Sequence, residues 1–480
     1  MSKILFVGAE AMPFAATGGL GDVMGSLPAA MKAADESNDI RVVMPLYSAV
    51  GESWRAQMKT EAVFDVHLAW RTLYCGVKSL VKDGVTYYFI DNEYYFKRDT
   101  LYGHYDDGER YAYFCMAVME MLDRVGFCPD VLHAHDWQSA LSVVYLNCLY
   151  RGRRGYENIK TVFTIHNIEY QGKYDFSILG DIFALGNEQR TLMEYNGCIN
   201  LMKGAIVCAD IVSTVSPRYA EEIRSPEYAH GLEHVIRLYE YKLRGILNGI
   251  DYTYYNPESD AVISQSYCAD TVENKAANKL ELQKKLGLPQ RADVPMLAII
   301  SRLASHKGLD IVSEMAYGLL RYQDVQFVVL GKGEAVYEQF FLDLERDFPE
   351  KAKALIEYDR DLSKRIYAAA DIFVMPSASE PCGLSQMIAS RYGAIPVVRE
   401  TGGLYDSIKG YWEKDGELMG NGFTFANYSS GELYDRICAA VELWHDEEKR
   451  AIYTKKIMNT DFSWTVSAKH YLDMYRDVLA

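Results

Sequence analysis

The 480-residue chain is long enough for two large domains or three small ones, and its 49% hydrophobic and 24% charged residues are typical of a globular, core-forming protein. A net charge of −16 argues against nucleic-acid binding, which needs a basic surface, and no segment has the roughly 20 apolar residues of a membrane-spanning helix. Nine scattered cysteines without a Cys-x-x-Cys pair disfavour a zinc site or a disulfide framework and favour the reducing cytoplasm.

Short β-branched segments alternate with helical ones from the N-terminus onward. In chain order, strands are expected at residues 4–9, 40–44, 86–90, 131–134, 161–165 and 211–215, with helices at 111–124 and 139–150 among them. The alternation restarts with strands expected at residues 296–301, 325–330, 372–375 and 395–398. This pattern predicts two α/β domains, each with a doubly wound parallel sheet that is covered by helices on both faces.

A turn-rich segment at residues 239–259 separates the two series of strands, and we place the domain junction there. The expected domains span residues 1–245 and 246–460, and residues 461–480 are expected to form an amphipathic helix that returns to the first domain. Two such domains leave a cleft between them, and ligands bind at the carboxyl ends of the parallel strands.

Two nearly identical glycine loops follow strands, one in each expected domain. The first is Thr17-Gly18-Gly19-Leu20-Gly21-Asp22, and the second is Thr401-Gly402-Gly403-Leu404. Glycines let the backbone approach a ligand closely, and the next helix's first amides attract anions. Each loop alone is also consistent with a tight turn, but the pair favours ligand binding. A nicotinamide dinucleotide site is disfavoured, because eight residues, 10–17, separate the first expected strand from the glycines and no acid ends the second strand.

A basic loop and an acidic residue follow two strands of the second series. Arg302 and Lys307 share one short loop, where they could hold a diphosphate leaving group. Glu380 precedes Pro381, which keeps it extended, and an expected helix at residues 384–392 follows. Glu380 could therefore stabilise a developing sugar cation, or it could simply cap that helix. The basic pair could likewise be an ordinary solvated loop.

Histidines end two expected strands of the first domain. His133 and His135 lie on one face of their strand, which raises the question of a metal site. We disfavour a metal, because Arg302 and Lys307 already neutralise phosphate and no Asp-x-Asp lies nearby. Hydrogen bonding to sugar hydroxyls suits His166 and Asn167 better.

These motifs together resemble those of the bacterial glycogen synthases and plant starch synthases, from one end of the chain to the other. The matching stretches are Thr17–Asp22, His133–Trp137, Thr164–Gly172, Ile246–Asp251, Ser301–Gly308, Glu380–Leu384 and Thr401–Leu404. The resemblance implies a GT-B fold of two Rossmann-like domains. It also implies transfer of glucose from ADP-glucose, sometimes UDP-glucose, to the non-reducing end of an α-1,4-glucan such as glycogen, with retained configuration, no cofactor and no metal.

The resemblance also assigns roles to residues. Arg302 and Lys307 would hold the diphosphate, Glu380 would lie near the reacting sugar, and His166 would contact the glucose 6-hydroxyl. Tyr358 would stack on the base, and Asp136 and Trp137 would face the acceptor. The remaining residues implied in substrate binding are Gly18, Gly19, Asp22, Asn167, Asn248, Cys382, Gly383, Leu384, Thr401, Gly402 and Gly403.

Two positions depart from the family's pattern. Ala16 stands where the family usually has lysine, which bears on donor affinity and on the choice between ADP- and UDP-glucose, and Ala378-Ser379 replaces a bulkier pair. Alternatives are a GT-B glucosyltransferase with UDP-glucose or a non-glucan acceptor, and an inactive glucan-binding homologue. Because no first-domain acid stands out as a nucleophile, we favour a front-face transfer over a covalent intermediate.

Overall fold

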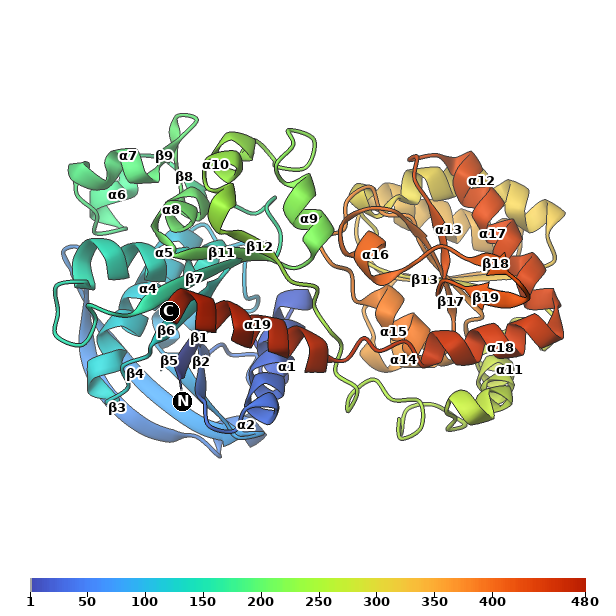
Figure 1. Cartoon of the computed structure of the whole chain (residues 1–480), viewed down its shortest axis with the longest axis horizontal. Helices are drawn as coiled ribbons and strands as arrows, with labels where there is room; N and C mark the ends of the chain where they lie inside the picture. Colours follow the sequence, from blue (N-terminus) through green and yellow to red (C-terminus); the bar gives the residue numbers. More distant parts are fainter. Residues whose placement is uncertain (1) are drawn as a thin grey trace. The chain divides into compact units, whose positions relative to one another are not determined.

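The computed structural model describes residues 2–480 and divides into two compact units. The first unit comprises residues up to Asn248 together with Trp464–Ala480, and the second comprises Gly249–Ser463 (Figure 1). Each unit has its own central sheet of mainly parallel strands, as the alternation of the sequence predicts.

The sheet of the first unit has nine strands in the order β12-β11-β7-β6-β1-β2-β5-β4-β3. Its parallel strands are β1 (Lys3–Val7), β2 (Asp39–Pro45), β5 (Val85–Asp91), β6 (Val131–His135), β7 (Lys160–Ile165), β11 (Ile211–Thr214) and β12 (Leu243–Gly245). The chain first builds outward from β1 through β2 and β5, then returns to add β6 on the other side. The order therefore reverses between β1 and β6, which is where such sheets bind ligands.

An antiparallel hairpin extends this sheet and has no counterpart among the expected strands. Strand β3 (Lys59–Leu68) pairs with β4 (Arg71–Lys82), and β4 pairs antiparallel with β5. Most side chains of β3 are exposed, so its sequence lacks the apolar run by which buried parallel strands are recognised. A small separate sheet contains β8 (Lys173–Tyr174), β9 (Glu194–Tyr195) and β10 (Cys198–Asn200).

The helices of the first unit include two from distant parts of the chain that pack together. They are α1 (Gly19–Ala34) and α19 (Trp464–Leu479), which lie side by side in Figure 1. Residues of α19 spaced three or four apart are buried, which is the pattern of an amphipathic helix. The other helices are α2 (Glu52–Arg55), α3 (Glu93–Phe96), α4 (Asp107–Arg124), α5 (Trp137–Tyr145), α6 (Ile178–Asp181), α7 (Arg190–Met193), α8 (Leu201–Cys208), α9 (Pro217–Glu222) and α10 (Glu233–Leu238).

The second unit has a six-stranded parallel sheet in the order β15-β14-β13-β16-β17-β20. Its strands are β13 (Met296–Ile300), β14 (Gln326–Leu330), β15 (Ala352–Leu355), β16 (Ile372–Met375), β17 (Ile395–Arg399) and β20 (Phe423–Phe425), and β18 (Trp412–Lys414) pairs separately with β19 (Glu417–Met419). Its helices are α11 (Lys275–Leu286), α12 (Leu309–Tyr322), α13 (Ala335–Asp347), α14 (Arg360–Ala369), α15 (Ser385–Arg391), α16 (Gly402–Ser407), α17 (Ser430–His445) and α18 (Glu447–Met458). Here the order reverses between β13 and β16.

Among residues 2–480, no helix is both long enough and apolar enough to cross a membrane.

Candidate active site

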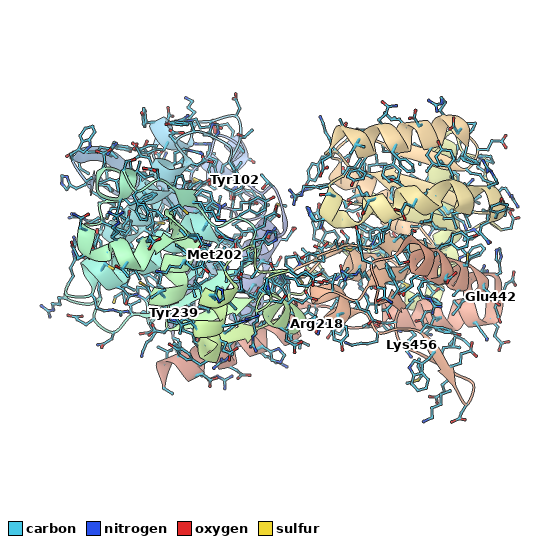
Figure 2. All side chains as sticks on the ribbon, turned by 90° about the horizontal axis from the view of Figure 1, so that it is seen from above. Tyr102, Met202, Arg218, Tyr239, Glu442 and Lys456 are labelled. Atoms are coloured by element: carbon cyan, nitrogen blue, oxygen red, sulfur yellow. The ribbon has the colours of Figure 1, made fainter. Side chains whose placement is uncertain are left out.

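A buried carboxylate organises the first glycine loop. Glu10 follows β1 and is 3% exposed. It accepts hydrogen bonds from the backbone N–H (2.6 Å) and hydroxyl (2.7 Å) of Thr17, from the N–H of Gly18 (3.3 Å) and from the hydroxyl of Tyr102 (2.6 Å). Tyr102 is labelled in Figure 2. Glu10 is not among the predicted site residues, although an acid directly after a buried strand was a usable signal.

Packing requires glycine at some positions of this loop and not at others. Gly18 precedes the first residue of α1, and a Cβ atom there would meet nothing within 4 Å, so packing does not require a glycine. A Cβ atom on Gly21 would lie 2.2 Å from Cβ of Ala16, so packing does require glycine there. Gly18 and Gly19 are exposed at the start of α1, and Asp22 lies in its first turn. The Gly18 N–H already donates to Glu10, so at this exposed start of a 16-residue helix it is the amides from Gly19 onward that are suited to binding an anion or a sugar oxygen.

Three histidines gather at the carboxyl ends of β6 and β7. Nδ1 of His135 lies 2.9 Å from Nε2 of His166, and the rings of His133 and His135 are 4.0 Å apart. Both nitrogens of His133 are engaged, one with the Tyr475 hydroxyl at 2.6 Å and one with the Thr164 hydroxyl at 2.5 Å. His133 therefore serves packing, and no set of three His, Cys, Asp or Glu side chains among residues 2–480 is arranged to hold a metal.

Asp136 fixes the backbone next to His166. Its φ of +58° is unusual for a residue other than glycine, and its Oδ1 accepts the N–H groups of His166 (2.7 Å) and Asn167 (3.4 Å). Burial raises the pKa of this carboxyl to about 7. The contacts of Asp136 thus point to a role in holding the turn at residues 166–167, where His166 and Asn167 are partly exposed.

Trp137, at the start of α5, packs its ring against Tyr111 at 5.4 Å and Tyr174 at 6.3 Å. Gly172 makes this possible, because a Cβ atom there would lie 2.8 Å from the indole. Trp137 nevertheless stays partly exposed.

Asn248 is buried, and its Oδ1 has no hydrogen-bond partner within the described part of the chain. An unpaired buried acceptor of this kind is available to a ligand.

The structure brings two predicted residues of the second unit into direct contact. Lys307 follows β13 and Glu380 follows β16, so both lie where the strand order reverses. Nζ of Lys307 donates to Oε2 of Glu380 at 2.6 Å, and the Ser377 hydroxyl donates to the same oxygen at 3.0 Å. Arg302 lies on the same loop as Lys307; its side chain is exposed and forms no ion pair within residues 2–480.

The second glycine loop packs against the Glu380–Cys382 backbone. Gly402 has a φ of +44°, and a Cβ atom on it would lie 1.9 Å from the Glu380 carbonyl oxygen. A Cβ atom on Gly403 would lie 2.1 Å from the Cys382 carbonyl oxygen. The Gly403 amide, which the resemblance implies in substrate binding, donates here to the carbonyl oxygens of Glu380 (3.1 Å) and Pro381 (3.2 Å).

The remaining predicted residues surround this segment. Cys382 and Thr401 are buried, which leaves the Cys382 thiol little access to solvent. Gly383 has a φ of +69°, and Leu384 precedes α15, which is shorter than the expected helix at 384–392. Tyr358 is 73% exposed, and its hydroxyl accepts a hydrogen bond from Nε of Arg360 at 2.9 Å. Its ring is therefore open to stacking.

Comparison with known proteins matches this description over the whole chain. The family model of the starch synthase catalytic domain matches residues 3–238, and that of glycosyl transferases group 1 matches residues 280–458. A glycogen synthase of Desulforamulus reducens is 45% identical over 99% of each chain, and one of Bacillus subtilis is 44% identical over 99% of this chain and 98% of its own.

Two solved structures align with the whole chain. The catalytic domain of starch synthase IV from Arabidopsis thaliana, bound to ADP and acarbose, aligns with a TM-score of 0.91 and 33% identity, covering 100% of this chain and 99% of that one. A sucrose-phosphate synthase from Thermosynechococcus elongatus aligns with a TM-score of 0.61 and 16% identity over 100% of this chain and 99% of its own, which shows a shared fold alone. The predicted GT-B fold class is confirmed.

Proposed function

This chain belongs to the glycogen and starch synthase family, and on that basis we propose that it transfers glucose from ADP-glucose to the non-reducing end of an α-1,4-glucan such as glycogen, with retention of configuration. The observation that carries the proposal is the pairing of Lys307 with Glu380 at the strand-order reversal of the second unit, on the loop that also presents Arg302. A retaining glucosyl transfer needs cations for a leaving phosphate and a carboxylate near a developing sugar cation.

The cations act on the leaving group. Arg302 has a guanidinium that no acid of the described chain neutralises, so it is ready to form two parallel hydrogen bonds with phosphate oxygens. Lys307 adds a point charge, which it shares with Glu380 until a phosphate arrives. Negative charge grows on the diphosphate as the bond to the sugar breaks, so both contacts strengthen toward the transition state.

The reaction then follows a front-face course. The bond between glucose C1 and the diphosphate oxygen breaks, and its electron pair leaves with the phosphate. The 4-hydroxyl of the glucan end forms the new C–O bond on the same face of the short-lived oxocarbenium ion, and its proton passes to the departing phosphate oxygen. Glu380, which is buried and held by Lys307 and Ser377, stabilises the positive charge of the sugar.

The proposed roles of the other residues complete the donor and acceptor sites. Tyr358 stacks on the adenine through its exposed ring, and His166 hydrogen-bonds to a sugar oxygen. ADP-glucose is the proposed donor because the related starch synthase IV structure is bound to ADP, and a glucan is the proposed acceptor because that structure also holds acarbose. UDP-glucose remains the competing donor, since Ala16 replaces the lysine usual in the family.

Transfer of radiolabelled glucose tests the proposal. The protein is incubated with labelled ADP-glucose or UDP-glucose, with and without glycogen, and label is counted in the precipitated polymer. We expect glycogen-dependent incorporation from ADP-glucose, and about 30- to 1,000-fold less with Lys307→Ala, the effect of losing 2–4 kcal/mol of transition-state stabilisation. Lys332→Ala, which removes an exposed lysine after β14, is the matched control.

Other results of this assay would identify a different donor, a different acceptor or an inactive protein. Incorporation from UDP-glucose alone would change the donor, and label found only in small products would change the acceptor. Glycogen binding without any transfer would make the chain an inactive glucan-binding homologue. Full activity in a folded Lys307→Ala variant would remove Lys307 from the mechanism.

A further inference from the structure

His135 lies behind His166 and has no role in the proposed chemistry, yet its surroundings are unusual. It is fully buried, and its ring stacks on that of Phe6 with centroids 5.5 Å apart and lies tilted against that of His133 with centroids 4.0 Å apart. Its Nδ1 is hydrogen-bonded to Nε2 of His166, whereas its Nε2 is buried and has no hydrogen-bond partner within residues 2–480. A buried nitrogen without a partner calls for an explanation.

The protons of this pair can be arranged in two ways. Burial holds the pKa of His135 well below its usual range and lowers that of His166 to about 3, so both rings are neutral near pH 7. A neutral imidazole has one N–H and one bare nitrogen. Either His135 donates from Nδ1 and has a bare Nε2, or His166 donates from its Nε2 and leaves His135 with a buried N–H that has no acceptor.

The two arrangements differ in cost. Buried N–H groups without an acceptor are rarer in proteins than buried acceptors without a donor, so the first arrangement is favoured. We infer that His135 is a positioning residue: by donating from Nδ1 to Nε2 of His166, it fixes His166 in the tautomer that presents Nδ1–H to the ligand. Nδ1 of His166 forms no hydrogen bond with any described residue, and the ring is partly exposed, so this N–H is free to donate.

This tautomer restricts what His166 can do. It can donate to a hydroxyl or phosphate oxygen, but it has no lone pair at Nδ1 and therefore cannot remove a proton from the acceptor hydroxyl. The inference rests on the proposed function for the identity of that oxygen: a sugar hydroxyl that acts as acceptor in the bond. It also leaves the departing phosphate as the base.

The test reads the tautomer directly. The ten histidines are labelled with ¹⁵N, and the His166 signals are identified by their loss in His166→Gln. Protonated and bare ring nitrogens resonate in separate ranges, so the spectrum of the unliganded protein shows which nitrogen of His166 carries hydrogen. We expect a protonated Nδ1 and a bare Nε2. A protonated Nε2 in the wild type would overturn the inference.

Substitutions then test the cause. His135→Leu removes the donor, so His166 should shift toward the Nε2-protonated form and kcat/KM should fall about 3- to 10-fold, the value of one net hydrogen bond. His135→Asn, which restores an N–H near the position of Nδ1, should recover the original tautomer and most of the activity. Equal losses in the two variants, or an unchanged tautomer in His135→Leu, would contradict the inference.

Tyr475→Phe is the matched control. It removes another buried hydrogen bond of the same cluster, that to His133, without touching the bond between His135 and His166. We expect a lower melting temperature with the His166 tautomer and kcat/KM unchanged; a tautomer change here would assign the effect to general loosening and overturn the inference. Because the spectrum needs no turnover, a wild type without glucosyl transfer would refute the proposed function and leave the tautomer result standing.

Discussion

Replacing Glu380 by glutamine should separate donor binding from catalysis. Oε2 of Glu380 is 2.6 Å from Nζ of Lys307, so the carboxylate and any bound phosphate compete for the same ammonium group. Glutamine keeps the shape and one acceptor oxygen but removes the negative charge. The substitution should therefore release Lys307 toward the donor while it removes the charge that stabilises the sugar cation.

The expected magnitudes follow from these contacts. A hydrogen bond to a charged group contributes about 1.5–3 kcal/mol, so freeing Lys307 by the lower figure tightens ADP binding by roughly tenfold. Loss of about 2–4 kcal/mol of transition-state stabilisation lowers kcat by ~30- to 1,000-fold. Glu380→Gln should thus show a lower dissociation constant for ADP together with a lower kcat, a combination that general damage to the site does not produce.

Two measurements decide the matter: calorimetric titration with ADP, and initial rates of glucosyl transfer at saturating donor. Ser377→Ala is the control, because it removes the other hydrogen bond to Oε2 at 3.0 Å and leaves both charges in place. It should change ADP affinity much less than Glu380→Gln does. If ADP binding in Glu380→Gln weakens in parallel with kcat, Glu380 supports the fold of the donor site, and the competition for Lys307 is refuted.

Three further predictions concern other residues. Ala16→Lys restores a cation beside the first glycine loop and should lower the donor KM several-fold without changing base preference; a neutral effect in initial-rate measurements would mean that the loop is adapted to alanine. Burial raises the pKa of the Asp136 carboxyl to about 7, so between pH 4 and 7 the folded state keeps a proton that the unfolded state has lost. The free energy of unfolding of the wild type should therefore fall by ~2–4 kcal/mol relative to that of Asp136→Asn as the pH rises from 4 to 8. Urea unfolding of both proteins across this pH range measures the difference. Lys275 donates from its buried Nζ to the carbonyls of Tyr367, Ala368 and Tyr392 at 2.8–2.9 Å. Lys275→Met should therefore lower the free energy of unfolding by at least ~3 kcal/mol, measured by denaturant titration. A smaller loss would show that the three carbonyls find other donors.

The sequence predicts the sheets of both units well, because buried parallel strands are continuous apolar runs. The strand expected at residues 372–375 coincides with β16, and most others agree within one or two residues at each end. The hairpin of β3 and β4 escapes prediction, since its exposed side chains alternate with buried ones along an edge. Turn and pairing geometry, rather than apolar runs, specify such strands.

The candidate residues were predictable by type and position but not by partner. Nothing in the sequence indicates that Lys307 and Glu380, 73 residues apart, form an ion pair. Glu10 had a usable signal in its position after a strand, but its partners Thr17 and Tyr102 lie 7 and 92 residues further along the chain and could not be predicted. Close packing of backbone against backbone likewise uses the Gly403 amide within the protein. Which hydrogen bonds form is decided by tertiary contacts, and those appear only in the folded chain.

Because α19 is made last, the first unit cannot complete its fold until the whole chain has been synthesised. Residues up to Asn248 leave the ribosome first, but the helix that covers α1 and bonds to His133 begins only at Trp464. The roughly 215 residues of the second unit intervene, which at typical translation speeds is a wait of roughly 10 to 40 s. Throughout that interval the nascent first unit exposes the surface that the buried face of α19 covers, and His133 lacks its partner Tyr475. The earlier-made half of this protein therefore finishes folding after the later-made half, and it is the half that has most need of a chaperone.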